Sequence, residues 1–202
     1  MYKHQRQPLL IVISGPSGVG KDSVVRRMRE RGLPFHFVVT ATSRPKRPHE
    51  VDGVDYFFVT EDEFHRMIEG EELIEHANVY GQLKGIPKQQ VRQALASGKD
   101  VVMRLDVQGA RTIHELSEQA LLIFLTTKDE DELIRRLKSR KTDSPEALEL
   151  RLTTAREEMK VVDDLFDYCV VNADSKLDAA VDTILDIINA EHHRTQPRKV
   201  EL

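Results

Sequence analysis

Short runs of apolar residues alternate with longer amphipathic stretches along most of the chain. The runs with the length of buried strands are 9–13, 35–39, 100–105, 120–125 and 168–171. Between them, apolar residues recur every three or four positions, which is the period of a helix that buries one face. Strands that alternate with helices favour an α/β fold with a mostly parallel sheet that is covered on both faces.

Seven stretches carry the helical period. They lie near 22–31, 60–70, 87–98, 113–116, 129–139, 145–162 and 177–188. Thr60 and Glu63 form a capping box for the second stretch, and Pro87 and Gly98 bracket the third. Further strand patterns occur at 55–59 and 72–79. The predicted elements therefore fill the chain from about residue 9 to residue 190.

The two ends and one internal loop break this order. Residues 1–8 are polar and are expected to be flexible, and the charged segment 191–202 is expected to be disordered. The loop 40–50 contains Pro45 and Pro48, which exclude a helix, together with several cations. We therefore expect one folded unit with a basic loop after its second strand.

Composition narrows the class of protein. A length of 202 residues fits one domain, and a formal net charge of −4 argues against a broad nucleic-acid-binding surface, so small molecules are the expected partners. The single cysteine, Cys169, lies in an apolar run, is expected in the core, and argues for a reducing compartment. No apolar run has the length of a membrane span. The expected location is cytoplasmic, without a nucleic-acid or membrane partner.

A glycine-rich loop follows the first apolar run and opens the first helix. Its residues are Gly15, Pro16, Ser17, Gly18, Val19, Gly20 and Lys21. Backbone N–H groups in such a loop point toward a bound anion, and Lys21 adds a positive charge. A tight turn without a ligand would not explain Lys21. The loop is therefore predicted to hold the phosphates of a nucleotide.

Asp22 stands where such loops usually carry a hydroxyl that reaches Mg²⁺. Its carboxylate is a suitable ligand for a hard cation, but it also places negative charge beside the phosphates. Ser23 lies about 100° further round the helix and is the weaker substitute. Asp22 is therefore the candidate ligand of a nucleotide-bound Mg²⁺, and both residues belong to the predicted nucleotide site.

The basic loop offers a second anion site. Arg44 and Arg47 can grip a phosphate through bidentate hydrogen bonds, and the hydroxyl of Tyr56 adds a neutral donor. These groups suit a phosphate monoester better than a polyphosphate that Lys21 already holds. From residue types alone, a solvated basic loop explains the pattern equally well.

The glycine-rich loop is one of several motifs. A second runs from Thr42 to Val59 and reads T-S-R-P-x-R-P-x-E-x-D-G-x-D-Y-x-F-V. The others are Leu73-Ile74-Glu75-His76-Ala77, Val107-Gln108-Gly109, Arg136-Leu137-x-x-Arg140 and Val171-Asn172. As a set, these motifs resemble the guanylate kinase family, and the similarity extends from about residue 9 to residue 190.

The resemblance implies a P-loop NTPase fold with a three-layer core and a mostly parallel sheet. The implied core is 9–39, 89–137 and 159–190, with a small α+β lobe for GMP inserted at 40–88 and a helical lid at 138–158. The implied reaction is ATP + GMP to ADP + GDP, with dGMP as a second acceptor to test. Mg²⁺ would accompany ATP.

The family's acceptor-site residues carry over one at a time. Arg44, Arg47 and Tyr56 match positions that bind the GMP phosphate, and Thr40 and Asp106 match further positions in that site. Glu75 matches the carboxylate that reads guanine, since it can accept from both N1–H and the 2-amino group, whereas adenine offers neither donor. An ordinary surface carboxylate is the alternative interpretation of Glu75.

The lid and the far side of the loop supply the remaining matches. Arg136, Arg140 and Arg151 match positions that close over the transferring phosphoryl group, so the implied catalytic set is these three with Lys21 and Arg44. Asn172 matches a residue near the adenine, although a turn at a strand end explains it nearly as well. No general base is required, because the attacking GMP oxygen is already anionic.

Three positions depart from the family pattern. Lys84 and Ile86 stand where a tyrosine and a serine are usual, so Lys84 would replace one phosphate donor by charge, while Ile86 replaces no donor to guanine. Arg104 stands where an acidic residue is common, and its effect is open. The alternatives are a same-fold kinase for a sugar phosphate such as ribose 1,5-bisphosphate, and a non-catalytic interaction module that resembles this family.

Overall fold

The computed structural model describes residues 6–48, 50–79, 81–138 and 145–201, and its centre is a five-stranded parallel sheet. The strands run in the order β2 (His36–Phe37), β7 (Val101–Arg104), β1 (Leu10–Ser14), β8 (Leu121–Thr126) and β9 (Tyr168–Val171). The central strand β1 is buried along its whole length. The predicted parallel sheet is therefore confirmed.

Alternate residues of β1 face two separate hydrophobic layers. Ile11 and Ile13 pack with residues of α1 (Lys21–Glu30) and α8 (Leu177–His192). Leu10 and Val12 pack with α3 (Lys88–Ala96) and α4 (Val107–Leu116) on the other face. Period-two alternation thus places helices on both sides of the sheet, as a three-layer α/β fold requires.

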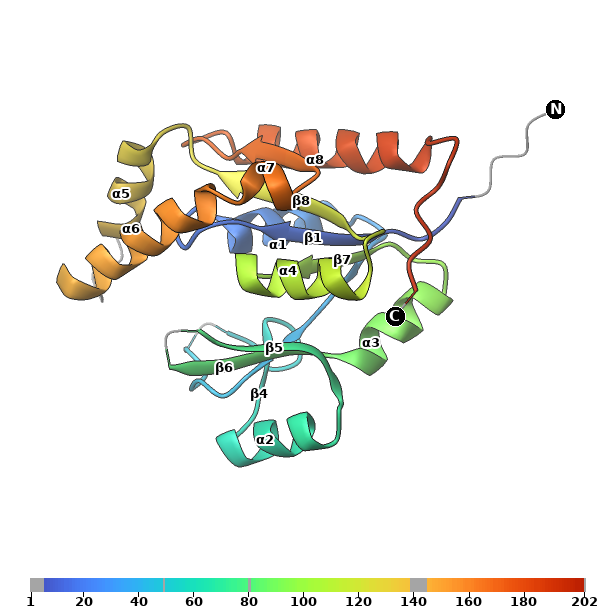
Figure 1. Cartoon of the computed structure of the whole chain (residues 1–202), viewed down its shortest axis with the longest axis horizontal. Coiled ribbons are helices and arrows are strands. Elements are labelled where there is room, and N and C mark those ends of the chain that lie inside the picture. Colours follow the sequence, from blue (N-terminus) through green and yellow to red (C-terminus); the bar gives the residue numbers. More distant parts are fainter. Residues whose placement is uncertain (1–5, 49, 80, 139–144, 202) are drawn as a thin grey trace.

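A second sheet of four strands lies to one side of the central sheet (Figure 1). Its strands run in the order β4 (Tyr56–Phe58), β3 (Thr40–Thr42), β6 (Gln82–Pro87) and β5 (Leu73–Val79). Helix α2 (Glu61–Glu69) covers it, and its capping box is confirmed, since Thr60 Oγ1 accepts from Glu63 N at 3.1 Å. The fully buried core of this unit is small and consists of Ala41, Phe64 and Leu73.

The strands β3 and β6 were not expected from the hydrophobic pattern, which indicates only loops there. They pair antiparallel with each other, and β6 also pairs with β5. Gly85 permits this arrangement, because a Cβ at that position would lie 2.8 Å from the Leu73 side chain and 3.0 Å from Phe64. A buried glycine in a short strand leaves no apolar signal in the sequence.

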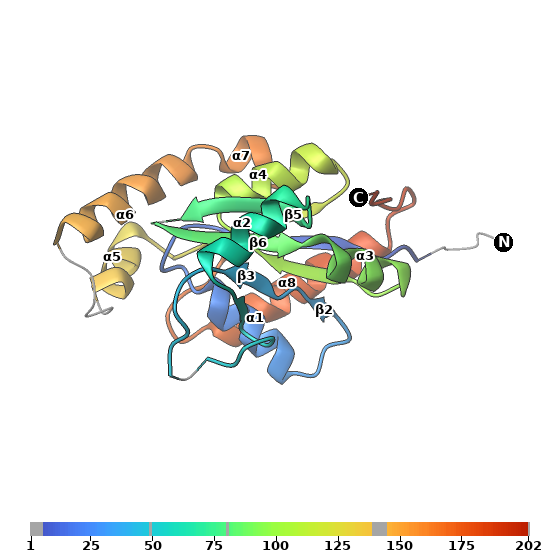
Figure 2. The ribbon, with the colours of Figure 1, turned by 90° about the horizontal axis from the view of Figure 1, so that it is seen from below.

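Two helices lie together at one end of the molecule. They are α5 (Glu130–Lys138) and α6 (Pro145–Met159), which both views place beside each other, and the short α7 (Val162–Leu165) follows (Figure 2). Leu152 and Ala155 of α6 join the same buried cluster as Leu133 and Leu137 of α5. This pair of helices therefore packs against the core next to the glycine-rich loop.

The expectation of a disordered C-terminal tail is wrong for residues 191–198. Arg198 is buried and donates to the Glu191 carboxylate at 2.7 Å, to the Asp167 carboxylate at 2.9 Å and to the Ala120 carbonyl at 3.0 Å. The charged composition suggested a solvated segment, but these charges are buried as a hydrogen-bonded group. Of the predicted flexible N-terminus, residues 1–5 lie outside the described residues, and Arg6 pairs with Asp100 at 3.0 Å.

Cys169 is exposed and does not lie in the core. It belongs to β9, an edge strand of the sheet, whose buried residue is the next one, Val170. An edge strand covered on one face alternates between buried and exposed positions, so its apolar run is misleading. Separately, a search of the described residues for a helix long and apolar enough to cross a membrane finds none.

Candidate active site

The glycine-rich loop joins the buried strand β1 to the first turn of α1. Gly15, with φ of 133°, lies so close to β8 that a Cβ there would be 2.2 Å from the Leu125 carbonyl oxygen. Gly20 caps α1 in a left-handed conformation, with φ of 97°. Only glycine adopts both conformations without strain. The resulting turn places the N-terminus of α1 beside the loop, at the carboxyl end of β1, where helix N–H groups can bind an anion.

The Lys21 side chain folds back into this loop. Its ammonium donates to the carbonyls of Gly15 and Pro16, the second at 3.0 Å. Burial lowers the pKa of Lys21 to about 8, although nearby carboxylates, Asp22 and Glu158 among them, oppose this shift. A phosphate that displaced the carbonyls would restore a favourable environment for the charged form.

Helix α6 presents two charged side chains to the loop. Arg151 donates to Ser17 Oγ at 2.7 Å, and Glu158 lies seven residues further, on the same face of the helix, where it interacts with Lys21. Burial raises the pKa of Glu158 to about 6, against the opposing effect of Lys21. Sequence reasoning missed Glu158, and its helical spacing from Arg151 is the signal that indicates it.

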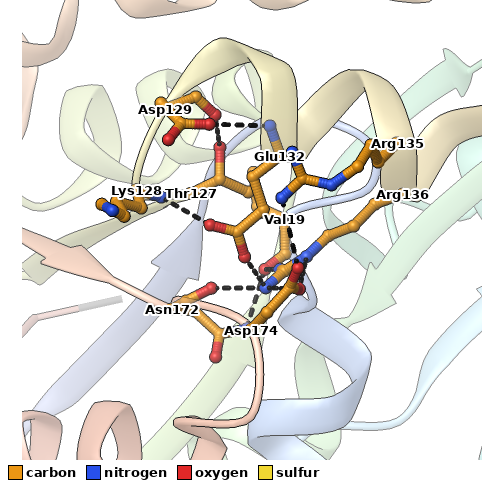
Figure 3. Close-up of polar contacts among 9 residues, drawn as sticks. All are labelled: Val19, Thr127, Lys128, Asp129, Glu132, Arg135, Arg136, Asn172 and Asp174. Atoms are coloured by element: carbon orange, nitrogen blue, oxygen red, sulfur yellow. Dashed lines mark hydrogen bonds and ion pairs between the residues drawn. The ribbon is translucent and has the colours of Figure 1, made fainter.

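Arg136 of α5 joins the glycine-rich loop to the end of β9 (Figure 3). It donates to the Val19 carbonyl at 3.0 Å and to the Asn172 carbonyl at 2.7 Å, and it pairs with Glu132 and Asp174. The Asn172 side chain also donates to Val19 O, at 2.9 Å. The structure thus joins α5, the loop and the end of β9. Arg140, the other predicted arginine of this segment, lies outside the described residues.

On the second sheet, Arg44 is buried and anchored. It pairs with both carboxylate oxygens of Glu50, and the Arg47 N–H donates to the same carboxylate at 2.8 Å. The Arg44 bonds lower the pKa of Glu50 to about 2. Arg44 also lies over the Tyr56 ring, 4.8 Å from its centroid. Glu50 belongs to the motif around Arg44, but its role as the partner of Arg44 was not predicted.

Arg104 connects the two halves of the site. It ends β7, in register with Ile13 of β1, and pairs with Asp22 Oδ1 at 2.8 Å. Its guanidinium also lies over the Tyr56 ring, 4.9 Å from the centroid. Lys84 is close to the same group, and burial, followed by repulsion from Arg104, lowers its pKa. The predicted phosphate donors therefore converge on one region from both sheets.

Glu75 is buried where the second sheet meets α4. Burial, and to a smaller degree the Asp106 carboxylate, raise the pKa of Glu75 to about 7. Asp106 caps α4 by accepting from Gly109 N at 2.8 Å, and a Cβ at Gly109 would lie 3.1 Å from Glu75 Oε1. Thr40, also buried, starts β3. The alternative of a surface carboxylate is therefore wrong for Glu75.

A search for metal ligands finds no group of three or more His, Cys, Asp or Glu side chains within the described part of the chain. Asp22 is next to Lys21 and keeps an exposed carboxylate, one oxygen of which faces Arg104. A single carboxylate suits Mg²⁺ that arrives on nucleotide phosphates, because such an ion keeps phosphate and water ligands. The residues present therefore fit a metal carried by the nucleotide.

Comparisons with known proteins agree with this geometry. The family model described as guanylate kinase matches residues 7–191. The chain is 53% identical over 197 residues to guanylate kinase 2, chloroplastic/mitochondrial, of Oryza sativa subsp. japonica, which covers 97% of this chain and 69% of that protein. It is 47% identical over 174 residues to guanylate kinase of Nocardia farcinica, with coverage of 85% and 90%.

A solved structure gives the same result. The crystal structure of guanylate kinase from Anaplasma phagocytophilum superposes with a TM-score of 0.77 at 28% sequence identity, and the match covers 95% of this chain and 89% of that one. The P-loop kinase fold and the family model therefore point to one assignment. The chain belongs to the guanylate kinase family.

Proposed function

We propose that this protein transfers the terminal phosphoryl group of ATP to GMP, yielding ADP and GDP. The observation that carries the proposal is the convergence of two phosphate sites: a P-loop with Lys21 on the central sheet, and Arg44 with Tyr56 on the second sheet. Arg104 touches both sides. In-line transfer needs two phosphates held end to end, which is the arrangement that two convergent sites supply.

On the donor side, the loop N–H groups and Lys21 would bind the ATP phosphates. The ammonium exchanges its carbonyl partners for phosphate oxygens, which raises the pKa that burial has lowered. The remaining predicted ATP contacts, among them Gly18, Ser23 and Asn172, stay predictions. Arg136 and Asn172 support the loop through Val19, so we assign Arg136 a positioning role in addition to the predicted one.

On the acceptor side, Arg44 is held in place by Glu50, while Arg47 is exposed and its side chain would have to turn toward the ligand. Together with Tyr56 and Lys84, they would bind the GMP phosphate, whose oxygen attacks without a general base. The segment 40–88 would thus act as the acceptor lobe. Thr40 and Asp106 complete the acceptor set.

Guanine recognition falls to Glu75. A carboxylate accepts from both N1–H and the 2-amino group, and such donors lower the raised pKa of Glu75 when guanine binds. Adenine would leave a buried carboxylate without these donors, and a site built on buried hydrogen bonds rejects the wrong base by up to roughly 10⁴ to 10⁵. Ile86 is buried and adds no donor.

Asp22 is the candidate protein ligand of a Mg²⁺ ion that arrives with ATP, and such an ion would supply positive charge against the charge that develops during transfer. One of the carboxylate oxygens of Asp22, Oδ1, pairs with Arg104. If Asp22→Ser left the Mg²⁺ titration of ADP release unchanged, the metal role of Asp22 would be rejected.

Helix α6 would close the site as part of a lid that spans 138–158. Arg151 already contacts the loop through Ser17, and lid closure would bring its guanidinium to the transferring group. An arginine placed there contributes roughly 10³ to 10⁵ in rate in related phosphoryl transfers. Arg140 keeps its predicted role in the same lid.

The test is a coupled ADP-release assay with ATP and four acceptors: GMP, dGMP, AMP and ribose 1,5-bisphosphate. We expect rapid turnover with GMP, and neither AMP nor the sugar phosphate should compete with it. Turnover with ribose 1,5-bisphosphate in place of GMP would reject the proposal. Failure to bind ATP in a direct titration would instead indicate a non-catalytic module.

A further inference from the structure

We propose that Arg104 is an additional phosphate-binding residue of the acceptor site, and that Asp22 is the residue that positions it. The inference rests on the proposed function and deepens it, because it assigns the GMP phosphate a ligand from the central sheet. It thereby gives a role to the ion pair between α1 and the end of β7.

The position of Arg104 is where α/β sheets bind ligands. It ends β7 at the carboxyl edge of the sheet, opposite Ile13, two residues before Gly15 of the P-loop. Its side chain is only 20% exposed, whereas that of its partner Asp22 is 70% exposed. The guanidinium is therefore held within the site, and the carboxylate approaches it from the solvent side.

Three cations from the two sheets gather in the region of Arg104. Its guanidinium and that of Arg44 both lie over the Tyr56 ring, 4.9 Å and 4.8 Å from the centroid. Burial lowers the pKa of Lys84, and the charges of Arg104 and Arg44 lower it further, while Asp22 and Asp106 oppose the shift. A phosphate monoester placed there would accept charge-assisted hydrogen bonds from these groups.

Asp22 and Glu50 have equivalent functions in this arrangement. Glu50 anchors Arg44 on the second sheet, and Asp22 anchors Arg104 on the central sheet. Each carboxylate fixes a guanidinium that would otherwise lose rotamer freedom when the ligand binds. With both guanidinium groups anchored beside Tyr56, the acceptor phosphate would receive one ligand from each sheet.

The alternative is that Arg104 only ties the second sheet to the core. Comparing GMP with guanosine separates the two roles, because the ligands differ only in the phosphate. A residue that binds phosphate affects GMP alone, whereas a residue that holds the lobe in place affects both ligands. Equilibrium binding without ATP or Mg²⁺ keeps metal effects out of the measurement.

The experiment measures both dissociation constants for the wild type, for four variants and for one control variant. For Arg104→Met we expect the dissociation constant of GMP to rise about tenfold, with that of guanosine unchanged. Arg104→Lys keeps the positive charge but cannot donate two parallel hydrogen bonds as arginine does. Its dissociation constant for GMP should therefore lie between those of the wild type and Arg104→Met. Asp22→Asn should raise the GMP constant about threefold, and Asp22→Asn combined with Arg104→Met should match Arg104→Met alone.

Arg27→Met is the matched control. Arg27 also pairs with an aspartate at 2.8 Å, but its partner Asp178 belongs to α8. This variant therefore removes a similar ion pair of α1, and we expect both dissociation constants to stay at the wild-type values in Arg27→Met.

Equal losses of affinity for GMP and guanosine in Arg104→Met would show that Arg104 only holds the second sheet against the core. Unchanged GMP affinity in a folded Arg104→Met would show that Arg104 has no role in binding. Either result overturns the inference. Circular dichroism establishes folding, and Arg104→Lys replaces Arg104→Met in the comparison if the latter does not fold. If the wild type binds neither ligand, the proposed function itself fails. Normal wild-type binding with an unaffected Arg104→Met rejects this inference alone.

Discussion

The two proposed phosphate sites rest on very different amounts of buried structure. The P-loop directly follows β1. This strand is buried throughout, and its residues belong to large hydrophobic clusters on both faces of the central sheet. The buried cluster that the second sheet forms with α2 has three residues, Ala41, Phe64 and Leu73. So small a core contributes little stability of its own. The donor site is therefore expected to be preformed, and the acceptor site to depend on its ligand.

The largest expected effect is on the donor side. Lys21→Met should lower kcat by at least about 10³-fold, because it removes the charge that we propose binds the transferring phosphoryl group. Its thermal midpoint should stay near the wild-type value, since the hydrogen bonds of Arg136 and Asn172 to Val19 still hold the loop. The ADP-release assay and thermal unfolding measure the two quantities.

Lys176→Met serves as the control for Lys21→Met, because Lys176 is exposed at the start of α8. We expect wild-type kcat there. A collapse of the thermal midpoint in Lys21→Met would show that the donor site is not preformed.

The next effect concerns base recognition. Glu75→Gln should raise the dissociation constant of GMP about 10²-fold, because the amide nitrogen meets a guanine donor and leaves buried hydrogen bonds unmade. ATP binding should be unchanged. Calorimetric titration measures both, with the exposed Glu72→Gln as control. Equal losses for GMP and ATP would assign Glu75 a structural role.

A third prediction examines the difference in stability directly. At a GMP concentration of 100 times its dissociation constant, amides of β3 to β6 should exchange up to about 10²-fold more slowly, since ligand binding opposes local opening. Amides of β1 and β8 should change little. Hydrogen exchange followed by mass spectrometry gives both sets of rates. Similar slowing in both sheets would mean that the two regions open as one unit.

The smallest expected effect is a pH dependence. The pKa of Glu75 is about 7 in the free protein, and guanine needs the charged form, so guanosine binding should weaken as pH falls. Between pH 7 and pH 6 the dissociation constant should rise about fivefold for a group with this pKa. Guanosine avoids titration of the phosphate. In Glu75→Gln the dependence should disappear, and a flat wild-type profile would contradict the raised pKa.

The same contrast explains what the sequence could predict. The P-loop and the strands of the central sheet follow from local pattern, because long apolar runs and obligatory glycines mark them directly. The strands β3 and β6 are short and held by pairing, and Gly85 serves packing that only the tertiary structure defines. Residues 1–5, 49, 80, 139–144 and 202 lie outside the described part of the chain.

Site residues divide in a similar way. Side chains that would face ligands carried a recognisable residue type, as with Lys21, Arg44 and Glu75. Glu50 and Glu158 were missed, because they act through Arg44 and beside Lys21 and carry no pattern of their own. In the sequence, Asp22 and Arg104 are two separate departures from the family pattern. Only the structure shows that the two side chains form an ion pair.

The contacts of Arg198 set the minimal length of the folding unit. The family pattern ends at residue 191, yet Arg198 inserts among Glu191, Asp167 and the carbonyl of Ala120. Truncation at the family boundary would remove the buried arginine that donates to both carboxylates and to the Ala120 carbonyl. The unit that must be expressed is thus longer than the unit that carries the family pattern, and a fusion partner belongs after Arg198.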